Sequence, residues 1–195
     1  MKKIIVIAML AFIANLITNA QNIIWQDDFN GNNNWSEFEY KNHSSSIVKD
    51  GVLTIKCEED NSFISKCRTN LNGNKNFSIS VEAVSKSGLK DNIYFGLVVN
   101  YLDRKNFSIF AIEKGFAYFI EYKNGAVVRE DYDVIKNTKT KTFTLELRKN
   151  SNSVIFVVND EETLDMDKVE VSTSIIGLFV SGKAEVSFDN LIIKQ

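Results

Sequence analysis

The stretch NIYFGLVVNYLDRKNFSIFAIEKGFAYFIEYKNG, residues 92–125, decides the fold of this chain. Its apolar and aromatic runs are separated by Glu113-Lys114-Gly115 and closed by Lys123-Asn124-Gly125. Asn-Gly is a strong hairpin signal, because both central residues of a type I′ turn adopt positive φ. The stretch therefore predicts successive antiparallel hairpins.

A two-residue period of apolar side chains recurs through the rest of the chain. It is clearest at residues 52–57, 77–83, 143–148 and 154–158. Turn-forming clusters separate these runs, and no stretch after residue 20 sustains the spacing of an amphipathic helix. The pattern predicts an all-β fold, an antiparallel two-sheet β-sandwich formed by one domain over residues 21–195.

The first 20 residues have the pattern of a secretory signal peptide. Met1-Lys2-Lys3 is basic, residues 4–17 are apolar apart from Asn15, and Ala20 supplies a small residue for cleavage. No cysteine stands at the cleavage point, which argues against a lipid anchor, and no later run approaches the roughly 20 apolar residues of a spanning helix. We expect a secreted or periplasmic protein.

The charges exclude one class of partner. The chain carries 23 basic and 25 acidic residues, a formal net charge of −2, and its lysines are spread singly. Nucleic-acid binding requires clustered positive charge. We therefore expect no nucleic-acid partner.

Both cysteines lie in the segment TIKCEEDNSFISKC, residues 54–67. The alternation on either side of residues 58–61 indicates a hairpin that sets Cys57 opposite Cys67. A disulfide between them is compatible with export. The alternative is two independent buried thiols, since free cysteine behaves as a small apolar residue.

Four segments together resemble a known superfamily: IIWQDDFNGNNNW at 23–35, DGVLTIKC at 50–57, the hairpins at 92–125, and IGLFVSGKAEVSFDNLIIKQ at 176–195. They are similar to laminin-G-like members of the concanavalin A-like jelly-roll superfamily. The resemblance implies a jelly-roll sandwich in which the first and last segments are neighbouring strands. Asp27 and Asp28 would then lie near Asp189.

The resemblance also implies a metal. Related sandwiches hold a structural calcium where the N-terminal segment meets the last strand, and the positions that match are Asp28, Asn30, Gly31 and Asp189. Ca²⁺ accepts six to eight oxygen ligands in loose geometry. The alternative is that Asp189-Asn190 forms a β-bulge or caps a turn.

Many domains of this superfamily bind glycans, which directs attention to the aromatic residues. Alternation puts Ile93, Phe95, Leu97 and Val99 on one face, and Tyr94, Gly96, Val98 and Asn100 on the other. The second set, joined by Tyr118 and Tyr122, is the candidate surface for stacking sugar rings. Trp35 is the candidate rim contact, and Trp25 is expected in the core. The alternative for each aromatic residue is a packing role.

Catalysis has less support in the sequence. Similar glycoside hydrolases carry Glu-x-Asp-x-x-Glu or a shorter form on one strand, and this chain lacks it; Glu161 to Asp167 is acidic but differently spaced. The single histidine, His43, lies in a polar loop. We predict a non-catalytic carbohydrate-binding module. A glycoside hydrolase with an unfamiliar carboxylate pair and an interaction or adhesion domain without a sugar site are the alternatives.

Overall fold

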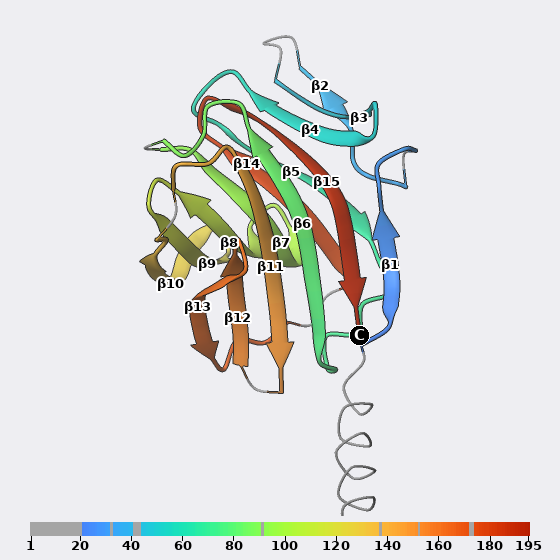
Figure 1. Ribbon diagram of the computed structural model, residues 1–195, viewed down its shortest axis with the longest axis vertical. Helices are drawn as coiled ribbons and strands as arrows, with labels where there is room; N and C mark the ends of the chain where they lie inside the picture. The colour runs from blue at the N-terminus through green and yellow to red at the C-terminus, as the bar shows by residue number, and fades with distance from the viewer. Residues whose placement is uncertain are drawn as a thin grey trace, which may run out of the picture.

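The computed structural model describes residues 21–31, 33–40, 44–90, 92–136, 138–151, 153–171 and 174–195. All regular elements within them are β-strands (Figure 1). The expected signal peptide and His43 lie outside the described residues. The all-β prediction is confirmed.

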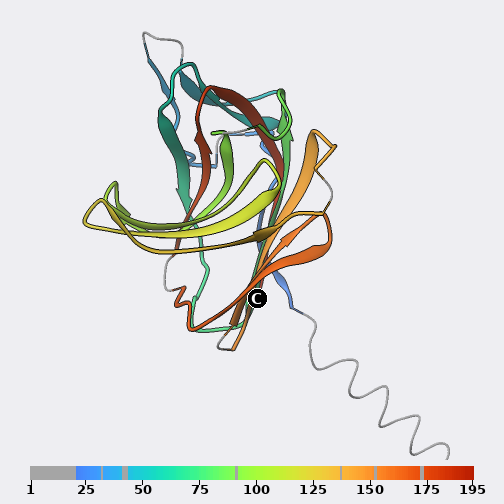
Figure 2. The same ribbon diagram turned by 90° about the vertical axis from the view of Figure 1, so that its left-hand side faces the viewer.

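The strands form two antiparallel sheets (Figure 2). The nine-stranded sheet contains β1 (Ile23–Asp27), β2 (Phe38–Glu39), β3 (Ser45–Lys49), β4 (Val52–Cys57), β6 (Phe77–Ser85), β11 (Thr142–Asn150), β12 (Ser153–Val158), β13 (Glu161–Asp167) and β15 (Ala184–Lys194). The six-stranded sheet has the order β10 (Ala126–Val134), β9 (Phe116–Lys123), β8 (Asn106–Glu113), β7 (Tyr94–Asp103), β14 (Ile175–Ser181) and β5 (Ser62–Arg68).

The core between the sheets follows from alternation. In β4 every second residue, Leu53, Ile55 and Cys57, is buried, as expected for a strand with one covered face. Phenylalanines join the two layers: the ring centroids of Phe95 and Phe143 are 5.6 Å apart. Each such aromatic pair contributes about 1 kcal/mol beyond the burial of its area. The two-sheet prediction is confirmed.

The structure also confirms that the first and last segments of the domain are neighbouring strands. Strand β1 pairs with β15, with Asp27 opposite Leu191 and Trp25 opposite Ile193. Beyond the strands, the Asn22 amide donates to the Gln195 carbonyl at 3.0 Å. The last strand, β15, therefore lies between β6 and β4 in its first half. Near its C-terminal end it pairs with β1 in place of β4.

The predicted hairpin over residues 54–67 is wrong. Strand β4 belongs to the nine-stranded sheet and β5 to the six-stranded sheet. Alternation identified both strands correctly, but their partners are distant in sequence: Cys57 pairs with Ala184, and Cys67 with Ile176. The Asn72-Gly73 turn likewise leads from β5 to β6 in the other sheet, whereas Asn124-Gly125 joins β9 to β10 as a hairpin, as predicted.

Because that hairpin does not form, the predicted disulfide between its strands is wrong as well. Cys57 and Cys67 are both free thiols, buried in the main core. The Sγ of Cys57 approaches the carbonyl oxygen of Val180 at 3.7 Å. Burial raises the pKa of each thiol to about 12, and the charge of Asp27 adds to the effect at Cys67. The alternative of two independent buried thiols is the one observed.

Candidate functional site

An aromatic surface covers the outer side of the six-stranded sheet, the side turned away from the nine-stranded sheet. We define the aromatic face by seven rings that come from four adjacent strands: Tyr94, Tyr101, Phe107, Phe116, Tyr118, Tyr122 and Tyr132. Six of these rings are half-buried and Tyr132 is exposed. This arrangement leaves ring area accessible while the strands hold the rings in place.

A second apolar cluster lies beneath the rings. It consists of Val98, Ile109, Ala111, Ile120 and Phe179, which are buried although they lie outside the main core. Gly177 is part of this layer: a Cβ there would lie 2.9 Å from the Ile64 side chain and 3.1 Å from that of Val98. These side chains occupy the space over the glycine. The outer side of the sheet is therefore packed as well as aromatic.

At one end of the aromatic face four rings are in contact. The centroids of Tyr94 and Tyr118 are 5.4 Å apart, those of Tyr118 and Tyr132 5.7 Å, and those of Phe116 and Tyr132 5.9 Å. Register explains the contacts, because Tyr132 pairs directly with Tyr118 across β9 and β10. Burial raises the pKa of Tyr94 and of Tyr118, and hydrogen bonding to Glu113 and its charge raise both further.

At the other end the rings stack. Phe107 and Tyr122 have centroids 4.7 Å apart and planes inclined by 23°, because they pair across β8 and β9. Tyr101 stacks on Phe107 at 6.3 Å, and the Lys66 ammonium lies 4.9 Å from the centre of the Tyr101 ring. Burial, followed by the charge of Glu130, raises the pKa of Tyr122.

The expected place of Asn100 on this face is wrong. Its φ is +56°, and the register between β7 and β8 shifts between Val99 and Asp103, which marks a bulge. The Asn100 side chain instead donates a 2.7 Å hydrogen bond to the Glu170 carbonyl. Tyr101 takes the outward position in its place. Alternation alone gives no sign of such a shift.

A hollow of about 470 Å³ opens beside the stacked end. Phe107 and Tyr122 line it, but so do Ser108, Phe119 and Glu121, which alternate with them and point to the core-facing side of β8 and β9, so the hollow lies outside the aromatic face. The polar lining comprises Asn100, Asn106, Ser108, Glu121, Lys123, Asn124, Arg129, Lys168 and Glu170. Of the predicted residues, Tyr94, Tyr118 and Tyr122 share the aromatic face, while Asn100 and Tyr122 share this hollow.

Trp35 is not a rim contact. It is only 3% exposed, and its ring lies 5.5 Å from that of Phe29. Its indole Nε1 donates to the Asp27 carboxylate at 2.8 Å. Trp25, expected in the core, is half-buried and packs against the core's edge. The Asn-rich sequence around Trp35 suggested exposure, but a buried carboxylate gave its N–H a partner.

The junction of β1 and β15 contains the residues proposed for calcium. A hollow of about 220 Å³ there is lined by Gln26, Asp27, Asp28 and residues 190–192. The Asp28 carboxylate accepts hydrogen bonds from Asn30, at 3.1 Å from its amide and 2.8 Å from its side chain, which lower the pKa of Asp28. Among the described residues no three His, Cys, Asp or Glu side chains gather as a metal site.

Asp189 and Asn190 form the bulge that was the alternative. Register shifts between Asp189 and Ile192, the φ of Asn190 is +52°, and the Asn190 amide donates to Asp189 Oδ1 at 2.6 Å. The bulge accounts for polar residues inside an apolar strand. It neither supplies nor removes a calcium ligand set, so the metal at Asp28, Asn30, Gly31 and Asp189 stays a prediction.

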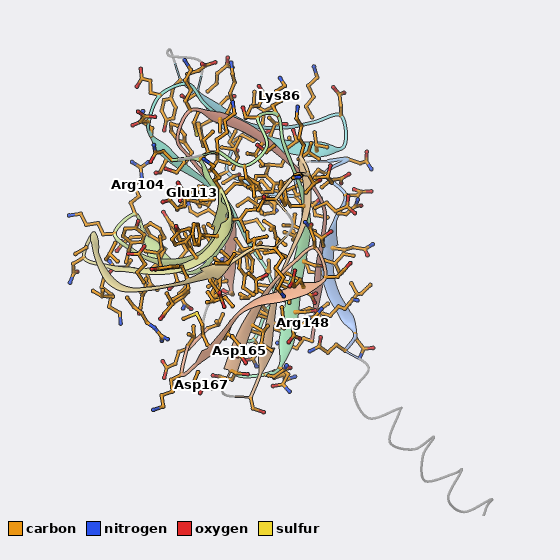
Figure 3. All side chains as sticks on the ribbon, turned by 60° about the vertical axis from the view of Figure 1, so that its left-hand side comes forward. Lys86, Arg104, Glu113, Arg148, Asp165 and Asp167 are labelled. Carbon is orange, nitrogen blue, oxygen red and sulfur yellow. The ribbon has the colours of Figure 1, made fainter. Side chains whose placement is uncertain are left out.

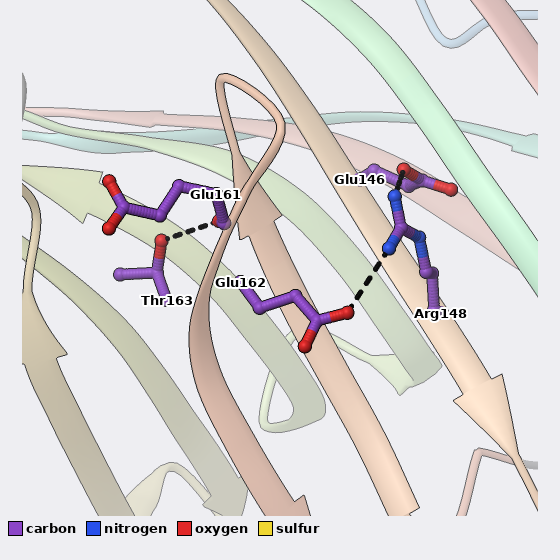
Figure 4. Close-up of polar contacts among 5 residues, drawn as sticks. All are labelled: Glu146, Arg148, Glu161, Glu162 and Thr163. Carbon is purple, nitrogen blue, oxygen red and sulfur yellow. Dashed lines mark hydrogen bonds and ion pairs between the residues drawn. The ribbon is translucent and has the colours of Figure 1, made fainter.

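The acidic run Glu161 to Asp167 is strand β13, at the edge of the nine-stranded sheet. Arg148 bridges Glu146 at 2.7 Å and Glu162 at 3.3 Å (Figure 4). Glu161 pairs with Lys136. These carboxylates therefore belong to surface ion pairs, away from the aromatic face.

Comparisons with solved structures show the fold. The Emp47p carbohydrate recognition domain has a TM-score of 0.64 at 12% identity and covers 90% of this chain and 96% of its own. An endo-acting O-glycanase of the human gut microbiota has a TM-score of 0.63 at 14% sequence identity. That match covers 89% of this chain and 99% of the other chain. A carbohydrate binding module from Bacillus subtilis has a TM-score of 0.51 at 15% sequence identity. That match covers 90% of this chain and 99% of the other chain. The chain has the concanavalin A-like jelly-roll fold.

Sequence comparison gives less. No protein-family model matches the chain. Copine-D of Dictyostelium discoideum is 35% identical over 95 residues, which are 47% of this chain and 17% of that protein. The chain thus spans under a fifth of the length of this relative. Within the described residues, no helix has the length and apolar character needed to cross a membrane.

Proposed function

We propose that this protein is a secreted, non-catalytic module that holds a polysaccharide or a surface glycan on the aromatic face. The observation that carries the proposal is the gathering of seven partly accessible rings on one side of the six-stranded sheet. Most outward-facing sheets of a monomeric domain are polar, and a contiguous apolar surface is a sign of a binding site.

The chemistry of the face suits sugars. A pyranose ring offers C–H groups that pack on aromatic faces, and its hydroxyls bond to polar groups around them. Here the phenol hydroxyls of Tyr94 and Tyr118 and the carboxylate of Glu113 are polar groups among the rings of the aromatic face. Carbohydrate-binding proteins among the structural neighbours support the proposal at the level of the fold.

A glycan array probed with the purified protein tests the proposal. Tyr118→Ala and Tyr122→Ala each remove one accessible ring from the face, and each is expected to weaken binding about fivefold or more, given that aromatic contacts contribute on the order of 1 kcal/mol or more. Tyr40→Ala is the matched control, because Tyr40 is 47% exposed and stacks on Phe63, outside the aromatic face. Binding that survives both face variants, or that Tyr40→Ala also abolishes, contradicts the proposal.

A glycoside hydrolase is the second candidate. Glu113 on β8 and Glu130 on β10 are carboxylates on the aromatic face, and hydrolysis of a glycosidic bond uses two such groups. The O-glycanase among the neighbours has the same fold. Release of reducing ends from the bound glycan, lost in Glu130→Gln with binding retained, would establish this activity. Binding without release over long incubation would leave the non-catalytic module.

A further inference from the structure

One end of the aromatic face combines rings with acidic groups. We define the tyrosine cage as Tyr94, Tyr118, Tyr132 and Phe116, whose successive ring centroids lie 5.4 to 6.2 Å apart. These rings come from β7, β9 and β10, and β8 lies between β7 and β9, so the cage is fixed by the pairing of four adjacent strands. The exposed ring of Tyr132, at 64%, leaves the cage open to solvent.

Two carboxylates border the cage. Glu113 pairs with Phe116 across β8 and β9, and its Oε1 accepts the Asn92 amide at 2.6 Å, which holds the side chain in place. Figure 3 shows Glu113 at the curved strands of the six-stranded sheet, away from Asp165 and Asp167. Glu130 pairs with Ile120 and precedes Tyr132 by two residues, which places both on the same side of β10.

The charges at the cage have one sign. The charged side chains that shift Tyr94 and Tyr118 are Glu113 and Glu130, and both raise the pKa of these phenols after the larger effect of burial. The opposite end of the face differs, because the Lys66 ammonium already lies over the ring of Tyr101 there. Glu113 thus borders the cage, Glu130 lies between the two ends because it also raises the pKa of Tyr122, and the stacked end holds a cation of its own.

We propose that the tyrosine cage, with Glu113 and Glu130, takes the protonated amine of an amino sugar within the bound glycan. A cation over aromatic faces is attracted by the ring quadrupole, and nearby carboxylates add direct charge attraction. A sugar carboxylate at the same place would be repelled by both glutamates. This inference rests on the proposed function and specifies its ligand: a glycan with free amino groups, oriented with them toward the tyrosine cage at the Glu113 end of the face.

Two oligosaccharides matched in ring and linkage test the inference. Calorimetric titration at pH 5.5 compares a β-1,4-glucosamine tetramer, whose amines are protonated, with the N-acetylated tetramer. The amine form is expected to bind on the order of tenfold more tightly, in line with roughly 1–2 kcal/mol for a cation in an aromatic cage. Added salt should reduce this preference, because both partners are charged.

Two conservative variants locate the effect. Glu113→Gln and Glu130→Gln keep the shape of the side chain and remove the charge, so each should reduce the preference for the amine form while the fold, followed by circular dichroism, is retained. Glu82→Gln is the matched control, because Glu82 lies on β6 of the other sheet. An unchanged preference in both face variants would overturn the inference.

The outcomes separate this inference from the proposed function. If the neutral tetramer or another neutral glycan binds as tightly, and Tyr122→Ala still abolishes that binding, the face is a glycan site and the cationic specificity is wrong. If no glycan on the array binds, both the proposed function and the amine specificity are wrong. A lysine-rich peptide that binds in preference to the amino sugar, with the same dependence on Glu130, would replace the amino sugar by a basic protein partner.

Discussion

Trp35 donates its indole N–H to Asp27 at 2.8 Å, while the other oxygen of that buried carboxylate accepts the Phe29 amide at the same distance. The pair fixes the loop after β1 against the core. Because Asp27 is 3% exposed, its oxygens depend on these donors in place of water. Two residues eight positions apart thus close the start of the described chain onto the sandwich.

Trp35→Phe is expected to lower the free energy of unfolding by roughly 1–3 kcal/mol, because it leaves a buried carboxylate oxygen without this donor. Urea denaturation followed by fluorescence measures the change. Trp25→Phe is the control and should cost less, since Trp25 is half-buried at the edge of the core. Equal effects of the two substitutions would mean that the hydrogen bond contributes nothing beyond ring packing.

Reductant should leave the stability unchanged, because Cys57 and Cys67 are free thiols in the core. With the pKa of each raised to about 12, neither should react with a thiol reagent at pH 8 in the native state, and both should react in urea. A spectrophotometric thiol assay in both conditions checks this. Fast labelling of the native protein, or a melting temperature that falls on reduction, would contradict the structure.

The same thiols predict an alkaline loss of stability. A thiol whose pKa is raised from 9.0 to about 12 stays protonated in the folded chain above pH 9, where the unfolded chain releases its proton. The native state then binds more protons, so the free energy of unfolding falls as pH rises from about 9 toward 12. Denaturation at pH 8 and pH 10.5 should show a smaller fall in Cys57→Ala/Cys67→Ala than in the wild type.

Gly96→Ala should destabilise the fold severely. A Cβ at this position would lie 2.0 Å from the Phe110 carbonyl oxygen and 2.6 Å from the Ala111 Cα, so β7 and β8 would have to separate. We expect a loss of about 3 kcal/mol or more, at the upper end for overpacking. Gly31→Ala is the control, because a Cβ there meets nothing within 4 Å. Comparable stability of both variants would show that the ladder tolerates the side chain.

Calcium can be tested through stability. If Asp28, Asn30, Gly31 and Asp189 hold a Ca²⁺, calcium should raise the melting temperature and a chelator should reverse the rise, because a ligand that binds only the native state stabilises it. Asp189→Ala should abolish the response. A melting temperature that is the same with calcium and with chelator would remove the metal from this junction.

The sequence predicted the fold because alternation is a local property. The period in β4, β6, β7 and β11 identified strands and their buried faces, and the two-sheet core follows from it. The choice of a partner strand is not a local property. For this reason the predicted hairpin over residues 54–67 is wrong. The segment between β4 and β5 crosses from one sheet to the other, although its residues have the composition of a tight turn.

The candidate site was only partly predictable for a related reason. Tyr94, Tyr118 and Tyr122 lie where alternation put them, but the bulge at Asn100 reversed the parity beyond it and brought Tyr101 outward. Glu113 stands next to the turn residues Lys114-Gly115, so the sequence gives no sign that it ends β8 beside the rings. Trp35 was misplaced because its partner, Asp27, is a charged residue that becomes buried only in the folded chain.

The pairing of β1 with β15 has a mechanical consequence. Asn22 and Gln195 are hydrogen-bonded to each other at the same end of this antiparallel pair, so a force that pulls these two residues apart loads its hydrogen bonds one after another. Such unzipping resists far less than the shearing of two strands along their length. Under tension between these points, β1 should peel away first, while the aromatic face in the other sheet keeps its shape.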